Sequence, residues 1–378
     1  MAMKKVVILQ HRLLHYRTGL FERLRERCLL DDISVELVHG YATRRESSKK
    51  DEGVIEWARP VQNRCVEIGE RDIIWQPYPA SVSGADLVVV MQESRILSNY
   101  VHLARRFLLG KKVAYWGHGR NFQTHAPSGF RERWKSLLLT KVDWWFAYTE
   151  MTKDILVEAG FPSACITTLN NAIDTSAFKS DLDSVSDLEV KEVKEAMGIG
   201  GSDPVAVFCG SLYPDKRLEL MVEAADYIKD RLPGFSLIVI GDGPSMQFVK
   251  AAQKDRPWIH LLGVKKGREK AKYFKCASVM LNPGLVGLHI VDAFCAALVM
   301  VTTNNAKHSP EVAYLNHGQN GFSVEDSAAV YGQTVVDLFL DPGRLKVMRG
   351  RALADSNVYS LENMVENFAK GINLALSS

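Results

Sequence analysis

The strongest constraint on the fold is the alternation of short, continuous apolar runs with longer segments of helical periodicity. Ten such runs are strand candidates: residues 6–9, 35–38, 87–91, 113–116, 144–148, 205–209, 237–240, 259–262, 279–281 and 299–302. Strands that are apolar on both sides, each followed by a helix, form parallel sheets with helices on both faces. The pattern therefore predicts an α/β protein with parallel sheets.

A polar segment divides the strands into two series. Residues 176–203 are rich in Asp, Ser, Glu and Lys and lead into Gly-Gly-Ser-Asp-Pro. We interpret them as a linker with one acidic helix and a loop. The length of 378 residues also suggests about two domains. We predict Rossmann-like domains at residues 1–175 and 204–358, and a C-terminal helix at 359–378 that is a candidate for crossing back onto the first domain.

The composition excludes several classes of protein. Apolar residues make up 47% and charged residues 24%, as in soluble globular proteins. No apolar run approaches the roughly 20 residues that span a bilayer, and the first run is too short for a signal peptide. The six cysteines are scattered, which argues against a zinc site or a disulfide framework and fits a reducing cytoplasm.

Charge and tryptophan are concentrated in the first half of the chain. Residues 1–175 hold 25 Lys and Arg against 20 Asp and Glu, and six of the seven tryptophans. One interpretation is a face for an anionic partner or a membrane surface. The other is an ordinary basic surface around an aromatic core, and the sequence leaves both open.

Several predicted strands of the second half end in loops with binding chemistry. "GSLYPDKR" begins at Gly210, where a glycine allows close backbone approach, and continues through Ser211 to Lys216 at a helix start. Lys216 is a candidate for meeting a diphosphate, although such lysines are commonly solvated surface charges. "GDGP" begins at Gly241 and is either a ligand loop or a plain turn. The backbone of Gly263 and Val264 is a candidate for pairing with a base edge.

The segment "NPGLVGLHIVDAF" has the pattern of a phosphate-binding loop. The backbone N–H groups of Gly287, Leu288 and His289 open a new helix, and free N–H groups together with the helix dipole favour a phosphate there. Asp292 lies one turn further along. Its carboxylate either accepts hydrogen bonds from two vicinal hydroxyls, such as those of a ribose, or complements the helix dipole.

The first half offers two candidate sites. His118 lies between Gly117 and Gly119 after a predicted strand, where it is either a cleft residue or the cap of a turn. "HRLLHYRTG" follows the first strand and carries Arg12, His15 and Arg17, which form either an acceptor-binding loop or a basic surface loop. Ligands of open parallel sheets bind at the carboxyl ends of strands, which favours both positions.

Taken in order, these motifs resemble the retaining GT-B glycosyltransferases of family four, the glycosyl transferases group 1. The matching segments are "WGHG", "LNNAIDTSAF", "GSLYPDKR", "VIGDGP", "IHLLG", "ASVMLNPGLVGLHIVDAFCAALVMVTT" and "SPEVAYLNHGQNG". The likeness covers about residues 110–350. It implies two Rossmann-like domains whose parallel sheets face each other across a cleft. Residues 1–175 would bind the acceptor, and residues 204–358 would bind the nucleotide sugar.

The resemblance also implies roles for single residues. The family's two glutamates, eight positions apart, correspond to Gly284 and Asp292, so the ribose carboxylate is kept and the carboxylate at the sugar ring is absent. The family's basic pair corresponds to Ser211 and Lys216, with Arg217 adjacent. Glu311 or backbone groups are candidates for replacing the missing contacts. By the same resemblance His118 points at the donor sugar or the reaction centre.

The function implied is retaining, metal-independent transfer of a sugar from a nucleoside-diphosphate sugar to a glycan or lipid-linked acceptor, in surface polysaccharide or lipopolysaccharide synthesis. His118 and Lys216 are the predicted catalytic residues. No cofactor, metal or nucleic-acid partner is predicted. The Asp181-Leu-Asp183 string fits a metal-binding Asp-x-Asp pattern, but it lies in the linker and not after a core strand. The expected location is the cytoplasm, with the inner membrane face as a candidate. A sugar-nucleotide epimerase, a phosphorylase and an inactive donor-binding scaffold are the alternatives.

Overall fold

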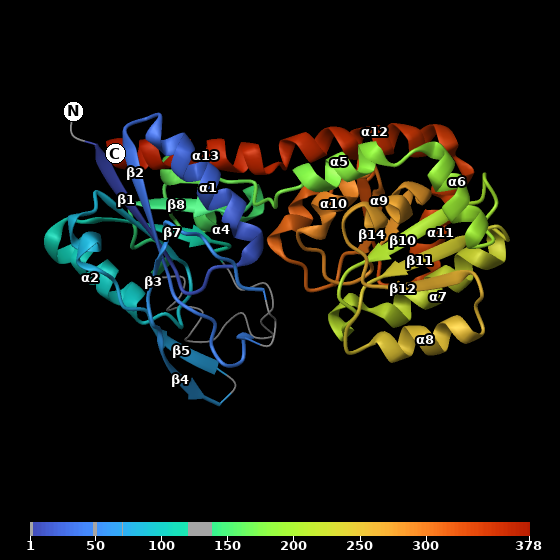
Figure 1. The fold of residues 1–378 in the computed structure, drawn as a ribbon, viewed down its shortest axis with the longest axis horizontal. Coiled ribbons are helices and arrows are strands. Elements are labelled where there is room, and N and C mark those ends of the chain that lie inside the picture. The colour runs from blue at the N-terminus through green and yellow to red at the C-terminus, as the bar shows by residue number, and fades with distance from the viewer. Residues whose placement is uncertain (1–2, 48–50, 70, 120–137) are drawn as a thin grey trace. The chain divides into compact units, whose positions relative to one another are not determined.

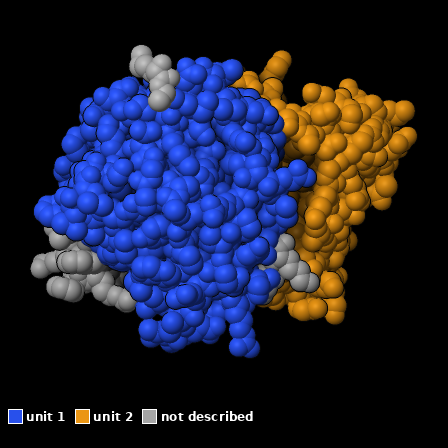
Figure 2. Space-filling view, turned by 60° about the vertical axis from the view of Figure 1, so that its left-hand side comes forward, with its two compact units in different colours: residues 1–174, 361–378 blue, residues 175–360 orange. Residues whose placement is uncertain are grey.

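The computed structural model describes residues 3–47, 51–69, 71–119 and 138–378. The chain divides into two compact units, one of residues 1–174 and 361–378 and the other of residues 175–360 (Figures 1 and 2). We call them unit 1 and unit 2 and describe each by itself. The last helix of the chain, α13 (Leu361–Ser377), thus belongs to unit 1.

Unit 1 is built on a seven-stranded sheet in the order β3-β2-β1-β6-β7-β8-β9, with all neighbours parallel. Its strands are β1 (Lys4–Gln10), β2 (Ile33–His39), β3 (Arg59–Pro60), β6 (Leu87–Met91), β7 (Lys112–Gly117), β8 (Trp144–Ala147) and β9 (Ile166–Thr168). A separate antiparallel hairpin joins β4 (Arg64–Ile68) to β5 (Arg71–Trp75).

Helices cover both faces of this sheet. On one face α1 (Thr18–Leu29) and α13 lie side by side (Figure 1), and their apolar residues, among them Phe21 and Phe368, pack with Val6 and Ile8 of β1. The other face packs Val7 and neighbouring strand residues under α4 (Glu150–Glu158) and α2 (Ser98–Leu109). Continuous burial of β1 on both sides explains its unbroken apolar sequence.

Unit 2 repeats this plan with a six-stranded parallel sheet in the order β12-β11-β10-β13-β14-β15. Its strands are β10 (Val205–Cys209), β11 (Ser236–Ile240), β12 (Ile259–Gly263), β13 (Val279–Leu281), β14 (Val299–Thr303) and β15 (Gly321–Val324). Its main helices are α7 (Leu218–Arg231), α8 (Met246–Lys254), α9 (Gly267–Cys276), α10 (His289–Cys295), α11 (Ala328–Leu340) and α12 (Pro342–Val358).

The segment expected as a linker contains two helices, α5 (Ser176–Ser184) and α6 (Asp187–Ala196), both packed against α9 of unit 2. A capping box begins α6, where Ser186 accepts from the backbone N–H of Glu189 and Glu189 accepts from that of Ser186. Such a cap satisfies two of the free donors at a helix start. The polar composition therefore reflects exposed helical surface over a small apolar contact with unit 2.

The predicted parallel α/β architecture is confirmed. Each of the ten predicted strands overlaps a strand of the structure. The sequence did not indicate β3, β9, β15 or the β4–β5 hairpin, because none of these strands is a continuous apolar run: they have the sequences RP, ITT, GFSV, RCVEI and RDIIW. Among the described residues, no helix combines the length and the apolar character needed to cross a membrane.

Candidate functional site

Three of the predicted loops of unit 2 meet at the carboxyl edge of its sheet. Gly210 follows β10, Gly241 follows β11 and Gly263 ends β12. The backbone N–H of Gly210 donates to Ile240 (3.0 Å), and that of Gly241 donates to Gly263 (2.9 Å). Gly241 has φ +142°, and a Cβ on it would lie 1.9 Å from the Gly210 carbonyl oxygen. At Gly241, only glycine allows the two turns to pack backbone against backbone.

Gly284 has a packing role of the same kind. A Cβ at this position would lie 2.2 Å from the carbonyl oxygen of Asp215 and 2.5 Å from Cα of Lys216. The next residue, Leu285, donates its backbone N–H to the same Asp215 oxygen at 2.8 Å. The loop after β13 is therefore pressed onto the 3₁₀ turn η5 (Pro214–Lys216). This backbone leaves no space for a side chain where the resemblance placed an acid.

Lys216 lies buried at this contact. It is 4% exposed, and its Nζ donates to the Leu285 carbonyl at 2.5 Å. Burial lowers the pKa of Lys216 to about 8, against a small opposing effect of Cys209. The ammonium is thus held by a neutral carbonyl and has no acidic partner in the part of the chain that the structure describes, which leaves its charge available to an anion. Ser211, five residues earlier, is exposed.

Arg217 is engaged elsewhere in the unit. Its guanidinium pairs with Asp326 and donates to Oγ1 of Thr303 at 3.0 Å. The residue begins α7 in the left-handed region, with φ 55°. The structure accordingly gives Arg217 a part in anchoring the end of β14 to the loop after β15, and its predicted contact with the donor stays a prediction.

Two histidines lie beside the start of α10. His308 accepts the backbone N–H of Val286 on Nδ1 (3.1 Å), and its Nε2 lies 2.6 Å from the Thr303 carbonyl. This arrangement requires the proton on Nε2. His289 has a buried Nε2 that has no partner among the described residues. Burial lowers the pKa of His289 well below its usual value, and the charges of Lys216, Lys270 and His308 lower it further.

Gly287, Leu288 and His289 lie where the sequence predicted, in the turn that enters α10. Within the described residues, none of their backbone N–H groups has a hydrogen-bond acceptor. The next two N–H groups, of Ile290 and Val291, bond back to Gly287 and Leu288 at 3.1 and 3.0 Å. Three neighbouring backbone N–H groups therefore lack acceptors in the described part of the chain, and they lie beside the basic side chains described above.

Asp292 has a partner that the sequence did not reveal. Nζ of Lys270, on α9, lies 2.7 Å from Oδ2 of Asp292. The two side chains are 16% and 17% exposed, so the pair is largely shielded. The same ammonium lies 4.2 Å from the ring centroid of Phe178 and 5.0 Å from that of Phe274. Lys270 sits in "GREKAKYFKC" among several lysines, so no pattern distinguished it.

In unit 1, His118 and Arg17 belong to one aromatic cluster. The His118 ring stacks on Tyr148 with centroids 5.6 Å apart. Arg17 lies 4.6 Å from the Trp116 centroid and donates to the Tyr148 hydroxyl at 3.2 Å. Burial lowers the pKa of His118; Glu93 opposes this shift and Arg17 adds to it. Nδ1 of His118 is buried without a partner in the described part of the chain.

Arg12 and His15 lie in a different environment. Arg12 is 9% exposed and pairs with Asp51 at 2.6 Å. His15 is exposed, with Nδ1 3.1 Å from the Asp51 carbonyl. Arg12 also comes within 3.9 Å of Glu46, whose pKa is held far below its usual range mainly by hydrogen bonds from His11 and Arg95 that overcome burial. Sequence reasoning missed this network because its members are far apart in the chain.

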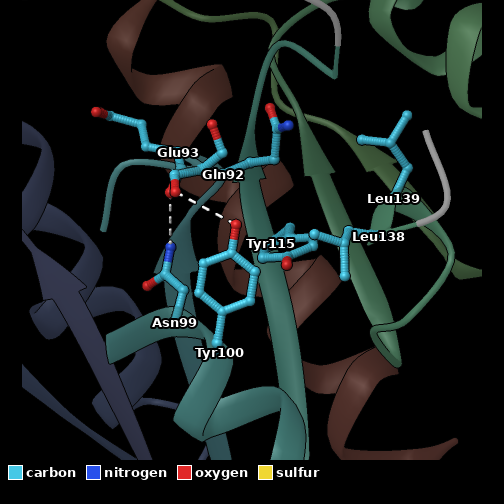
Figure 3. A pocket seen from close by; sticks show the side chains of 8 residues that line it. Gln92, Glu93, Asn99, Tyr100, Tyr115, Leu138 and Leu139 are labelled. Carbon is cyan, nitrogen blue, oxygen red and sulfur yellow. Dashed lines mark hydrogen bonds between the residues drawn. The ribbon is translucent and has the colours of Figure 1, made fainter. Parts of the chain in front are cut away.

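A small cavity lies near the carboxyl ends of β6 and β7 (Figure 3). It is lined by Gln92, Glu93, Ser94, Asn99, Tyr100, Tyr115, Leu138 and Leu139. Asn99 donates to the Glu93 carbonyl at 3.3 Å, and Tyr100 donates to that of Ser94 at 3.3 Å. The cavity of about 20 Å³ has room for one water molecule, which excludes it as a sugar site.

The environment of Gly284 predicts that substitution there is costly. We expect Gly284→Ala to lower the free energy of unfolding by about 1–3 kcal/mol, because the loop must move off η5. Gly350 is the matched control, since it lies inside α12 with open space around its Cα. Gly350→Ala should raise stability by about 0.5–1 kcal/mol. Urea unfolding of both variants checks this, and an unchanged Gly284→Ala midpoint would contradict it.

The chain is similar in sequence to several known proteins. Residues 203–341 match the family described as Glycosyl transferases group 1. The chain is 23% identical over 279 residues to the candidate glycosyltransferase EpsD of Bacillus subtilis (strain 168), covering 69% of this chain and 70% of EpsD. It is 27% identical over 139 residues to the alpha-monoglucosyldiacylglycerol synthase of Acholeplasma laidlawii, covering 35% of this chain and 34% of that enzyme.

Solved structures extend the likeness to the whole chain. Alr3699/HepE from Anabaena, solved in complex with UDP, has a TM-score of 0.67 at 14% identity, covering 98% of this chain and 99% of that one. The lipopolysaccharide outer core galactosyltransferase WaaB has a TM-score of 0.64 at 12% identity, covering 98% and 99%. The chain therefore has the GT-B fold, and residues 203–341 of unit 2 match the group 1 glycosyltransferase family.

Proposed function

We propose that the protein is a retaining glycosyltransferase of family four, which transfers a sugar from a nucleoside-diphosphate sugar to a glycan or lipid-linked acceptor in the synthesis of a surface polysaccharide or glycolipid. The observation that carries the proposal is the set of basic groups in unit 2, Lys216, Lys270 and His289, beside one carboxylate, Asp292. The set lies within the group 1 domain. The relatives named above support the acceptor class, since one is a diacylglycerol glycolipid synthase and another acts on lipopolysaccharide.

The charges suit the chemistry of this transfer. Breaking the bond between the anomeric carbon and the diphosphate builds negative charge on the leaving group, and fixed positive groups stabilise that charge. Lys216 presents an ammonium that is already desolvated and held by the Leu285 carbonyl. The N–H groups of Gly287, Leu288 and His289 offer further donors. We propose that these groups together bind the diphosphate and that no metal ion is needed.

Asp292 is assigned to the ribose. Its Oδ2 is bonded to Lys270, and the carboxylate retains a second oxygen for a hydroxyl pair. Gly210, Ser211, Gly241, Gly263 and Val264 complete the proposed donor site, as the resemblance implies. Retention then follows if the acceptor hydroxyl attacks on the face that the diphosphate leaves, with the leaving phosphate taking the proton. That route needs no carboxylate at Gly284.

In unit 1, we assign His118 to the reaction centre and Arg12, His15 and Arg17 to the acceptor side. A neutral imidazole is favoured by the burial of His118, so its unpartnered Nδ1 is suited to accept or donate one hydrogen bond. The Arg17 guanidinium, stacked on Trp116, supplies a fixed positive charge next to it. The Arg12 pair with Asp51 holds the loop after β1 in place.

A panel of UDP-, GDP- and ADP-sugars tests the proposed activity. We expect one class of donor to bind and to be hydrolysed slowly to free sugar, with the anomeric configuration retained, because water replaces the acceptor hydroxyl. Proton NMR follows the configuration directly. Release of an epimerised sugar nucleotide would favour an epimerase. Binding without turnover, even with lipid-linked acceptor extracts, would reduce the protein to a donor-binding scaffold.

The buried Lys216 predicts a pH dependence of nucleotide binding. A bound diphosphate favours the charged lysine, whose pKa in the free protein is about 8. The affinity for UDP should be full below pH 8 and should fall by up to about tenfold per pH unit above it, since one proton is taken up on binding. Calorimetry between pH 7 and 9.5 measures this. Lys216→Arg keeps its charge and should flatten the profile.

Stability should move in the opposite direction over the same range. Because the folded-state pKa of Lys216 is depressed, the unfolded chain binds more protons between about pH 8 and 10.5, so the contribution of Lys216 to the unfolding free energy rises with pH there. A decline in UDP affinity that only reflected a loss of folded protein would therefore be distinguished, because a falling unfolding free energy would accompany it. A constant UDP affinity from pH 7 to 9.5 would contradict the role of Lys216.

The Lys270–Asp292 pair predicts a specific loss of ribose recognition. Wild-type protein should bind UDP more tightly than its 2′,3′-dideoxy analogue by about tenfold or more, the worth of hydrogen bonds to a charged group. Asp292→Ala should bring this ratio close to one, and Lys270→Met should lower it, since Asp292 loses the partner that orients it. The control is Lys272→Met, which lies on α9 like Lys270 but breaks a pair with Glu189 of α6, and it should leave the ratio unchanged. Equal ratios in all four proteins would contradict the assignment.

A further inference from the structure

The β4–β5 hairpin of unit 1 presents an open strand edge. Its strand β5 is tied to the unit, because Ile74 donates its backbone N–H to Arg95 at 2.9 Å and accepts that of Leu97 at 2.8 Å. Its strand β4 is exposed at every position and lies at the lower edge of unit 1 in Figure 1. In the described residues β4 pairs only with β5. A two-stranded hairpin has little stability of its own in water, so a further strand at this edge would stabilise it.

The unpaired backbone groups of β4 follow from the ladder. Ile68 and Arg71 are the last opposed residues before the turn. The two residues beyond them are adjacent in the chain and cannot bond each other, so Ile68 and Arg71 form a hydrogen-bonded pair. The two kinds of pair alternate along an antiparallel ladder. Cys65 and Glu67 therefore direct their N–H and C=O groups away from β5, and among the residues described here these groups have no hydrogen-bond partner.

One face of the hairpin is apolar and open to solvent. Val66 is 62% exposed and Ile68 58%, and Trp75 on β5, which lies on the same face, is 37% exposed. On the opposite face Ile74 is fully buried and Asp72 is 5% exposed, so that side of the hairpin is fixed to the unit. Exposed apolar side chains thus lie next to unpaired backbone groups, which is the combination that favours the addition of a strand.

We propose that this edge pairs with the same edge of a second copy of the chain. Two identical strands related by a two-fold axis perpendicular to the sheet run antiparallel, and one surface then serves both copies. The product is a continuous sheet in the order β5-β4-β4-β5, in which each hairpin gains the neighbouring strands that it lacks. This interface goes beyond the proposed sugar transfer and does not depend on it.

The sequence of β4 is complementary to itself in one register. With Val66 opposite the partner's Val66, Cys65 lies opposite the partner's Glu67, and their outward backbone groups exchange both hydrogen bonds. Val66 then meets its copy at a non-hydrogen-bonded position, where side chains approach most closely. Arg64 lies opposite the partner's Ile68, so no like charges are opposed. A register centred on Glu67 would oppose two carboxylates directly, which destabilises a strand pair.

Sedimentation velocity of the full chain at rising protein concentration tests the association. A single short strand per copy makes an interface smaller than that of most stable complexes, so we expect a reversible equilibrium that shifts from monomer to dimer. A monomer at every concentration overturns the proposal. A trimer or an open series of oligomers overturns it as well, because pairing about a two-fold axis uses both edges and closes at the dimer.

A proline substitution tests the role of the backbone edge. Glu67→Pro removes an outward N–H and leaves the inward ladder with β5 intact. The association constant should fall by about tenfold or more, because a hydrogen bond is lost at each of the two equivalent positions. Glu67→Ala is the matched control, since it removes the side chain and keeps the N–H, and it should associate like wild type. An unchanged constant in Glu67→Pro, or an equal loss in Glu67→Ala, overturns the assignment.

The same variants distinguish lost pairing from other causes. The melting temperature and the UDP affinity of Glu67→Pro, measured on the monomer, should be close to those of wild type, because the substitution lies on an exposed strand. A Glu67→Pro protein that is unfolded would be replaced by Val66→Lys, which keeps every backbone group of β4 and opposes two charges across the two-fold axis. Val66→Lys should abolish the dimer, and a dimer as strong as that of wild type overturns the proposal.

Oxidative cross-linking tests the register. Cys65 is exposed, but in the proposed register it lies diagonally from the partner's Cys65, at about 7–8 Å, which is too far for a disulfide. Val66→Cys, combined with Cys65→Ala, places a thiol directly opposite its copy, with Cα atoms about 4.5 Å apart. Mild oxidation should therefore cross-link this double variant and leave wild type uncross-linked on a non-reducing gel. The reverse pattern, or no cross-link in either protein, overturns the register.

Discussion

The hydrogen bond from Lys216 to the Leu285 carbonyl connects the two loops on which the donor site of unit 2 depends. Lys216 ends the turn after β10, and Leu285 lies in the loop after β13. These strands are neighbours in the sheet, so their carboxyl ends meet at one edge. The contact requires a close approach of the two backbones, and Gly284 permits it because any Cβ there would strike Asp215. A single glycine therefore determines both the position of the ammonium and its burial.

Burial then sets the electrostatics of the region. An ammonium with a carbonyl as its neighbour lacks a counter-ion, and desolvation lowers its pKa. The nearby imidazoles respond in the same direction: burial lowers the pKa of both His289 and His308, and the charge of Lys216 lowers each further, although the hydrogen bond to Thr303 opposes the shift at His308. Lys270 is the exception, since Asp292 compensates its charge. Lys216 thus lacks a counter-ion within the described residues, and a bound diphosphate would supply one.

The sequence predicted those parts of the structure that depend on local or periodic signals. Apolar runs identified the central strands, because strands that are buried on both faces are apolar at nearly every position and do not alternate with polar residues. Glycine-rich turns such as Gly210 and Gly241 were found because their backbone geometry excludes other residues. The edge strands β3, β9 and β15 contain polar residues or glycine and so form no continuous apolar run. The helices of the expected linker are held by contacts with α9, which no local pattern in the sequence indicates.

Side-chain partners were beyond the reach of the sequence for a different reason. Lys270 and Asp292 are 22 residues apart, and their pairing depends on how α9 and α10 lie on the sheet. The network of Arg12, Glu46 and Arg95 depends likewise on three loops that only the topology brings together. The Gly284 position illustrates the difference most clearly. In the sequence motif, Gly284 indicated only the loss of a carboxylate, whereas in the structure it permits the close contact that buries Lys216.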